Sequence, residues 1–207
     1  MESLRGAPPV DGDFTRRMIL SQLFVKQTNS PLGSIYFVAT DRALTGLYLE
    51  TQSAQCTANA RRVNKHDVID FAIAELTSYF GGGLTSFSTP IEMSGTAFQK
   101  TVWNALLDIP FGETRSYSEL AEKVGKPRAA RAVGTANGKN PLGIFVPCHR
   151  VIGADGSLTG YAGGIANKRW LLAHESAVVA GSDKGDFRAG SQLAIPGLTM
   201  FLAAAPI

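Results

Sequence analysis

The chain changes its sequence pattern near Glu92, and this change limits the fold more than any other feature. Between Met18 and Glu50, short β-type runs separated by turn residues predict an antiparallel meander. Apolar residues at helical spacing then predict one helix, which the three glycines 81–83 end. Beyond an extended connector, residues 84–94, helix follows helix. Strands first and helices afterwards predict an α+β fold.

We therefore divide the chain into four parts. Residues 1–15 are rich in Gly and Pro and are predicted to form a loose arm. Residues 16–92 are predicted to form an N-terminal α/β structural domain, and residues 93–176 a C-terminal domain. Residues 177–207 are predicted to be a tail, partly disordered or docked on the body.

Two capping boxes predict helix starts in the C-terminal domain. Thr96 pairs with Gln99 in one, and Ser116 pairs with Glu119 in the other. Residues 125–127 then form a tight turn with a proline at the first position of a third helix. Two short helices across such a turn suggest a helix-turn-helix, although helical hairpins in ordinary cores have the same spacing.

The third helix combines small side chains with long basic ones. A slim helix can approach a phosphate backbone, and its arginines can reach phosphates or enter a groove. Close packing between helices explains the same composition. The small residues include Ala129, Ala130 and Gly134, and the basic residues are Arg128 and Arg131.

The basic excess of the chain lies in the same part. The net charge is +3, and residues 93–176 hold ten Lys and Arg against six Asp and Glu. An anionic partner and a solvated face are both compatible with this distribution.

Cys148 stands beside His149 inside an apolar run, residues 143–152, which we interpret as a buried strand. A buried cysteine commonly acts as a small apolar residue. An adjacent base changes this expectation, because the thiolate is the reactive form and a free thiol, with a pKa of about 8.5, is mostly protonated at neutral pH. Consecutive side chains of a strand point to opposite faces, so their contact needs a turn at Pro147 or a bridging water. Glu175 is the carboxylate candidate that would orient His149. The sequence therefore predicts a Cys–His–Glu relay.

The remaining Cys and His residues are scattered, so we predict no metal site and no cofactor. Cys56 is interpreted as a spare thiol. The sequence contains neither a signal h-region nor a run long enough to span a bilayer. The expected compartment is a reducing one, the cytoplasm in a prokaryote or the nucleus in a eukaryote, and the protein is expected not to be secreted.

The residues around Cys148 resemble those of the O6-alkylguanine-DNA alkyltransferase family. The resemblance rests on the run Val-Pro-Cys-His-Arg-Val-Ile at 146–152, the Asn-Pro turn at 140–141, the loop 160–164 and the run Lys-Arg-Trp-Leu-Leu at 168–172. It covers residues 95–176, and the part before it is similar in outline to that family's N-terminal domain. It implies an antiparallel sheet with a helix in a ribonuclease H-like outline, then a mostly helical domain with a helix-turn-helix and a short active-site strand or hairpin.

The resemblance implies single-turnover DNA repair, the reaction of a methylated-DNA–protein-cysteine methyltransferase. Cys148 would take the alkyl group irreversibly from O6 of guanine, or less readily from O4 of thymine, after the base is flipped out through the minor groove. His149 would act as the base through a water, and Glu175 would orient it. Asn140 would hold the turn beside the cysteine, and Tyr117 would protonate N3 of the leaving guanine.

The resemblance also implies how DNA is bound. Arg131 would fill the place of the flipped base, and further DNA contacts are expected from Tyr117, Arg128, Ala129, Ala130 and Gly134. The guanine pocket would be lined by Val151, Tyr161 and Ala162, the last of which is a serine in some relatives. The expected partner is double-stranded DNA read with little sequence specificity by a monomer, with cooperative binding left open and no membrane partner.

Two other functions compete with this interpretation. A Cys–His–Glu hydrolase or acyltransferase would use the same relay, but the sequence offers no obvious oxyanion-hole loop and would leave the helix-turn-helix unused. A relative that only binds alkylated DNA should lack the nucleophile, and Cys148 is present.

Overall fold

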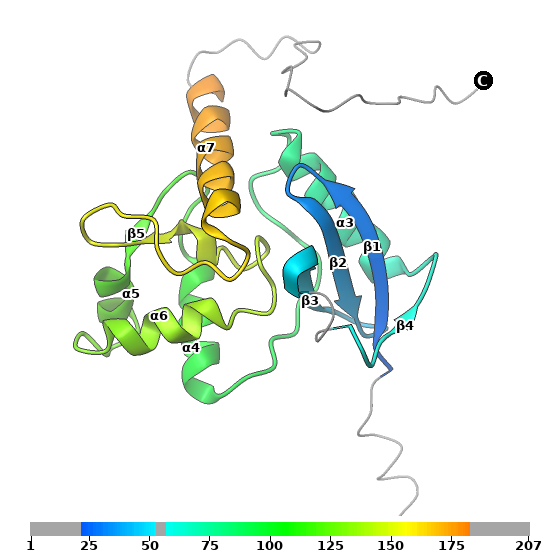
Figure 1. Cartoon of the computed structure of the whole chain (residues 1–207), viewed down its shortest axis with the longest axis horizontal. Helices are drawn as coiled ribbons and strands as arrows, with labels where there is room; N and C mark the ends of the chain where they lie inside the picture. The colour runs from blue at the N-terminus through cyan, green and yellow to red at the C-terminus, as the bar shows by residue number, and fades with distance from the viewer. Residues whose placement is uncertain (1–21, 53–56, 183–207) are drawn as a thin grey trace, which may run out of the picture.

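The computed structural model describes residues 22–52 and 57–182 (Figure 1). The predicted arm, Cys56 and the tail beyond Ser182 lie outside the described residues.

The N-terminal part is built on a four-stranded sheet in the order β3-β2-β1-β4. β1 (Phe24–Ser30), β2 (Gly33–Ala39) and β3 (Leu44–Leu49) form the predicted antiparallel meander. The two-residue β4 (Arg61–Arg62) joins β1 in parallel. A short 3-10 turn, η1 (Glu50–Gln52), follows β3.

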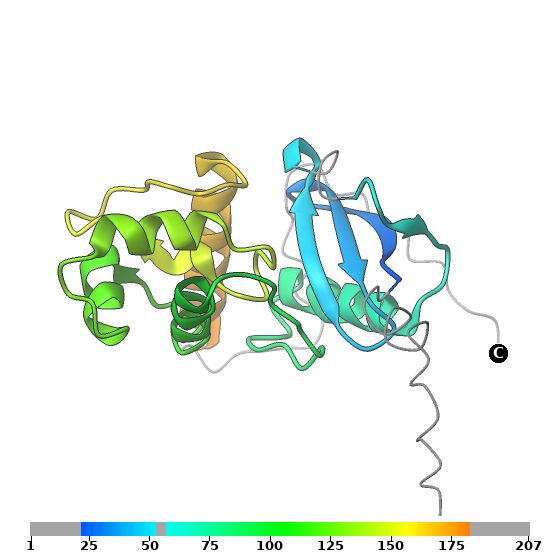
Figure 2. The same ribbon diagram turned by 90° about the horizontal axis from the view of Figure 1, so that it is seen from below.

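A single helix, α3 (Asp67–Phe80), covers one face of this sheet (Figure 2). Its apolar residues recur at helical spacing, so one side of the helix is buried. His66 begins the helix as its N-cap, with Nδ1 accepting from the amide of Ile69. The buried residues of α3 are Ile69, Ala72, Leu76 and Tyr79.

The C-terminal part is mostly helical, as predicted, so the α+β fold class is confirmed. Both capping boxes are present and begin α4 (Ala97–Leu107) and α5 (Tyr117–Lys123). The remaining helices are α6 (Ala130–Gly138) and α7 (Ile165–Ser182). β5 (Arg115–Ser116) pairs in parallel with β6 (Val151–Ile152).

Two helix boundaries differ from the sequence interpretation. The third helix was expected to begin at Pro127, but α6 begins at Ala130, because residues 126–129 form a turn closed by the Ala129 amide on the Lys126 carbonyl at 2.8 Å. α7 continues beyond Ser176, where we expected the tail to begin, and ends at Ser182.

The two parts share one core and are joined along β3. The connector pairs with β3 through the Leu44 amide on the Pro90 carbonyl at 2.8 Å. The Leu47 amide donates to the Pro141 carbonyl at 2.8 Å, which ties the sheet to the loop before Cys148. None of the helices within 22–52 and 57–182 combines the length and apolar character needed to cross a bilayer.

Candidate active site

Cys148 lies in a single 3-10 turn, η2 (Cys148–Arg150), and not within a strand. The strand interpretation was wrong for this segment because Pro147 has no amide hydrogen to continue a ladder. The chain turns there instead, with the Arg150 amide donating to the Pro147 carbonyl at 3.0 Å. Only β6, after the turn, is a strand, and its partner β5 is parallel, so the site is not a hairpin.

Two asparagines hold this turn from its inner side. Asn140 donates through Nδ2 to the Val146 carbonyl at 2.8 Å and accepts through Oδ1 from the Leu142 amide at 3.0 Å. Asn137, which the sequence interpretation missed, donates to the Cys148 carbonyl at 3.3 Å. The backbone of the turn is therefore held on both sides of Pro147.

The Cys148 thiol is buried, with 6% of the residue exposed. Burial raises the pKa of the thiol, and a hydrogen bond from Asn140 and the positive charge of Lys168 oppose this rise only in part. The thiol therefore needs a base to ionise it at neutral pH.

His149 is fully buried and contacts Glu175 as the sequence predicts. Nε2 lies 2.8 Å from Oε1 of Glu175. Because an ionised carboxylate only accepts, the proton belongs on Nε2, and Nδ1 keeps a free lone pair. Among the described residues Nδ1 has no hydrogen-bond partner. Burial lowers the pKa of His149 and outweighs the opposing effect of Glu175, so the ring is a neutral proton acceptor.

Glu175 is a fully buried carboxylate surrounded by donors. It accepts from Nε and Nη2 of Arg150 at 2.9 Å each, from the Gly112 amide at 2.9 Å and from the Tyr79 hydroxyl at 2.7 Å. Burial alone would raise its pKa, but the hydrogen bonds and charges of His149 and Arg150 lower it to about 2. Glu175 is thus ionised at neutral pH.

Lys168 is a second buried charge that the sequence interpretation left without a role. Its Nζ donates to the carbonyls of Val151 and Thr159 at 2.6 Å each and lies 5.8 Å from the centre of the Tyr117 ring. Lys168 therefore joins β6 to the loop that carries Tyr161. The helical spacing of Lys168, Leu171 and Glu175 was the available signal, since all three lie on the buried face of α7.

We expect Lys168→Met to lower the free energy of unfolding by about 1–3 kcal/mol, because the buried Val151 carbonyl loses its donor and the Thr159 carbonyl keeps only the Tyr117 hydroxyl, while the length of the side chain is kept. Urea unfolding at neutral pH measures the change. Lys100→Met, at an exposed position of α4, is the matched control and should change stability little. Equal stability of the two variants would contradict the bracing role of Lys168.

The predicted pocket residues lie around the same loop. Val151 is buried, Tyr161 is half-buried and Ala162 is exposed. Gly160 has φ +62°, and a Cβ there would lie 2.9 Å from the Tyr117 hydroxyl, so glycine is required at this close approach. The Tyr117 hydroxyl donates to the Thr159 carbonyl at 3.0 Å.

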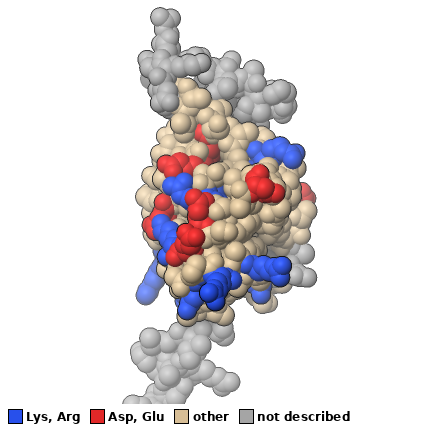
Figure 3. Space-filling view, turned by 90° about the vertical axis from the view of Figure 1, so that its left-hand side faces the viewer, with Lys and Arg blue, Asp and Glu red and all other residues tan. Residues whose placement is uncertain are grey.

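The predicted DNA-binding helix presents its arginines to solvent. Arg128 and Arg131 are exposed, and in the described part of the chain neither forms an ion pair. Ala129 and Ala130 are half-buried. Gly134 lies beneath the Tyr117 ring, where a Cβ would be 3.5 Å from Cδ1. Figure 3 views the side on which α5 and α6 lie, and Lys and Arg gather along its lower edge, below a group of Asp and Glu.

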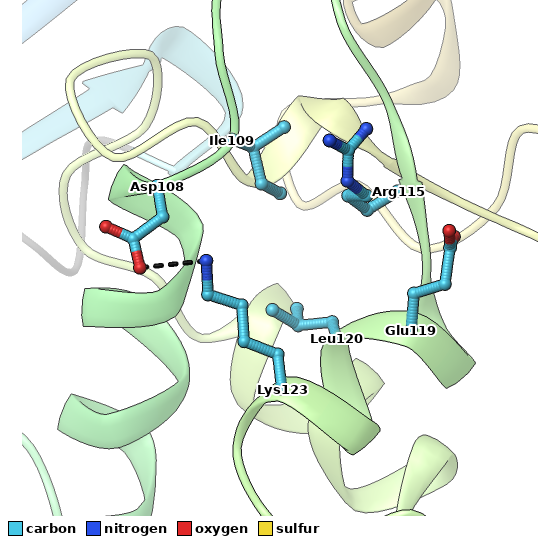
Figure 4. A pocket seen from close by; sticks show the side chains of 6 residues that line it. All are labelled: Asp108, Ile109, Arg115, Glu119, Leu120 and Lys123. Atoms are coloured by element: carbon cyan, nitrogen blue, oxygen red, sulfur yellow. Dashed lines mark ion pairs between the residues drawn. The ribbon is translucent and has the colours of Figure 1, made fainter.

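Two hollows occur elsewhere in this part of the molecule. One, of about 250 Å³, lies between α4 and α5, where Lys123 pairs with Asp108 at 2.8 Å (Figure 4). The other, of about 460 Å³, is lined by the connector, the residues at the end of α4, and Ile144, Phe145, Pro147 and Arg150. Cys148 lines neither hollow, and neither is the predicted guanine pocket. Residues 22–52 and 57–182 contain no cluster of three Cys, His, Asp or Glu that could hold a metal ion.

Comparison with known proteins finds one family along most of the chain. Residues 23–93 match the family described as "6-O-methylguanine DNA methyltransferase, ribonuclease-like domain", and residues 97–177 match its "DNA binding domain". The methylated-DNA–protein-cysteine methyltransferase of Mycolicibacterium paratuberculosis is 47% identical over 150 residues, which are 72% of this chain and 90% of the relative. The protein of the same name from Methanosarcina barkeri is 46% identical over 143 residues, 69% of this chain and 90% of the relative.

A solved structure has a similar fold. The crystal structure of Mycobacterium tuberculosis OGT in complex with DNA matches with a TM-score of 0.70 and 45% identity, over 75% of this chain and 94% of that one.

Proposed function

The chain belongs to the 6-O-methylguanine DNA methyltransferase family, and on this premise we propose that it repairs DNA by moving the methyl group of O6-methylguanine onto Cys148. The bond between the methyl carbon and O6 breaks as the bond to Sγ forms. Guanine is restored, and the protein keeps an S-methylcysteine. Because the carbon–sulfur bond of the resulting thioether is stable in water, each molecule would act once.

The arrangement of Cys148, His149 and Glu175 is the observation that carries this proposal. Glu175 keeps the Nε2 proton of His149 in place, and Nδ1 is then free to take the thiol proton through a bridging water. The base is needed because burial raises the pKa of Cys148. Asn140 fixes the turn on which the thiol stands.

Tyr117 is proposed to donate a proton toward N3 of the leaving guanine. Burial raises the pKa of its hydroxyl, which is therefore protonated at neutral pH. Its present acceptor, the Thr159 carbonyl, lies in the loop that would line the guanine pocket with Tyr161, Ala162 and Val151. The same pocket would accept O4-alkylthymine less readily.

DNA is the proposed partner, bound as a duplex through its minor groove by a monomer with little sequence preference. The alkylated oxygen lies within the base stack, so the nucleotide has to be extruded at a cost of a few kcal/mol. Exposed Arg131 on α6 would fill the space that the base leaves, and Arg128, Ala129, Ala130 and Gly134 would lie along the backbone. The reaction would take place where the DNA is, which in a prokaryote is the cytoplasm.

We expect Arg131→Ala to slow repair in duplex DNA about ten- to hundredfold, since a cost of a few kcal/mol for base extrusion is no longer offset. Its reaction with free O6-benzylguanine should be nearly unchanged. Single-turnover rates on both substrates measure this, with the exposed Arg62→Ala of β4 as the matched control. Equal slowing on both substrates would remove the extrusion role.

Intact mass after incubation with an oligonucleotide that contains O6-methylguanine tests the proposed function. We expect a gain of about 14 Da, one methylene, that maps to Cys148 with at most one turnover per molecule. Many turnovers would instead favour a hydrolase, and a folded, reduced sample without an adduct would favour a damage-binding protein.

A further inference from the structure

Tyr79 is a residue of the N-terminal part that reaches the centre of the candidate site. It lies in the last turn of α3, and its side chain is fully buried. Phe87, Phe111 and His174 surround the ring, with centroids 5.4, 5.8 and 5.3 Å away. The hydroxyl at the end of this packed ring lies against α7, where Glu175 accepts from it.

The Tyr79 hydroxyl donates to Oε1 of Glu175 at 2.7 Å. The same oxygen is the partner of His149 Nε2 at 2.8 Å and of Arg150 Nη2 at 2.9 Å. A donor from the N-terminal part of the chain therefore meets two donors from the C-terminal part on one carboxylate oxygen. Hydrogen bonds to an ionised acceptor are short and strong, so this contact restrains the carboxylate.

A second contact fixes α3 against α7 at the same place. Nε2 of His174 donates to the main-chain carbonyl of Tyr79 at 2.8 Å. Adjacent residues of α7, His174 and Glu175, thus hold the main chain and the side chain of Tyr79. Figure 1 shows α3 and α7 on facing sides of the two parts of the molecule.

We propose that Tyr79 is a positioning residue for alkyl transfer: its hydroxyl holds Oε1 of Glu175 in the place where that oxygen accepts the hydrogen bond from Nε2 of His149. The N-terminal part then contributes directly to the activation of Cys148. This inference rests on the proposed function, because it gives Tyr79 a part in the same relay.

Loss of the hydroxyl has two consequences for His149. The carboxylate gains freedom to turn away from Nε2, and more of its negative charge faces the imidazole. The added charge stabilises the protonated ring, which cannot accept the thiol proton. Arg150 on η2, Lys168 and His174 on α7 and the Cys148 thiol are the other titratable or charged groups around this pair, and they are unchanged by the substitution.

Tyr79→Phe removes the hydroxyl and keeps the ring. We expect Cys148 to react with free O6-benzylguanine about tenfold more slowly at neutral pH, and the acid limb of the rate profile to move to higher pH. Tyr36→Phe, the same change at a half-buried position of β2, should leave the rate and the limb unchanged.

Phe80→Leu tells an effect of the Tyr79 hydroxyl apart from an effect of loosened packing around its ring. The ring centroids of Phe80 and Tyr79 lie 5.5 Å apart, so truncation of Phe80 disturbs the same cluster while the Tyr79 hydroxyl stays. The inference predicts a lower melting temperature for Phe80→Leu with an unmoved acid limb. An equal shift of the limb in Tyr79→Phe and Phe80→Leu would overturn it, and so would an unaltered profile in Tyr79→Phe.

Labelling of Cys148 by iodoacetamide distinguishes failure of this inference from failure of the proposed function. The reagent reports thiolate formation without any alkylated base. If the unaltered protein takes no alkyl group from guanine but its labelling profile shifts in Tyr79→Phe, the positioning role stands and the proposed function fails. If guanine alkylates Cys148 and neither profile responds to Tyr79→Phe, the positioning role fails alone.

Discussion

Cys148→Ala is expected to gain no mass from DNA that contains O6-methylguanine and to bind that DNA as the unaltered chain does. The substitution removes the only proposed acceptor of the methyl group, so transfer should fall below detection. Binding should remain, because the thiol is buried and the exposed Arg128 and Arg131 are untouched. Intact mass and a gel-shift titration on the same oligonucleotide measure the two properties.

Cys56→Ala is the matched control for this experiment, since it removes the other cysteine of the chain. It should transfer the methyl group at the rate of the unaltered protein. Retained transfer by Cys148→Ala would refute the proposed mechanism. Loss of transfer by Cys56→Ala would show that Cys56 takes part in the reaction.

The parts of the fold that depend on local spacing could be predicted from the sequence. The capping boxes at Thr96 and Ser116 each involve a partner three residues away, so their hydrogen bonds need nothing from the rest of the chain. The strands of the meander are equally local. The His149–Glu175 contact was also predicted, because Glu175 in the late helix was the best carboxylate candidate to orient the histidine.

The rest depends on contacts that no local pattern describes. The apolar run around Cys148 resembles a strand, but its side chains are buried within an irregular turn braced by Asn137 and Asn140. Pro127 indicated the start of the third helix, but a turn follows it and the helix begins at Ala130. The hydroxyl of Tyr79 reaches Glu175 across 96 positions of sequence, and a tyrosine at helical spacing gives no sign of such a partner.

Glu175→Gln should be the most destabilising single substitution in the site. Glutamine keeps the shape of the side chain but leaves the guanidinium of Arg150 buried without a counter-charge. Breaking a buried ion pair in this way costs about 3–5 kcal/mol. Transfer should also slow by about 10²- to 10⁴-fold, because an amide can present either its oxygen or its NH2 group to Nε2 and no longer specifies which nitrogen of His149 carries the proton. Urea unfolding and single-turnover rates at pH 7 test both, with exposed Glu122→Gln as the matched control.

The pH dependence of this loss of stability tests whether the charge of Glu175 is its cause. Its pKa is lowered from an ordinary 4.5 to about 2 in the folded chain, so its contribution to stability is complete above pH 4.5 and is lost as the pH falls toward 2. That contribution is about 3 kcal/mol. The difference in unfolding free energy between the unaltered chain and Glu175→Gln should therefore be large at pH 7 and shrink between pH 4.5 and pH 2. A difference that stays constant across this window would mean that packing, and not the ionised carboxylate, accounts for the loss.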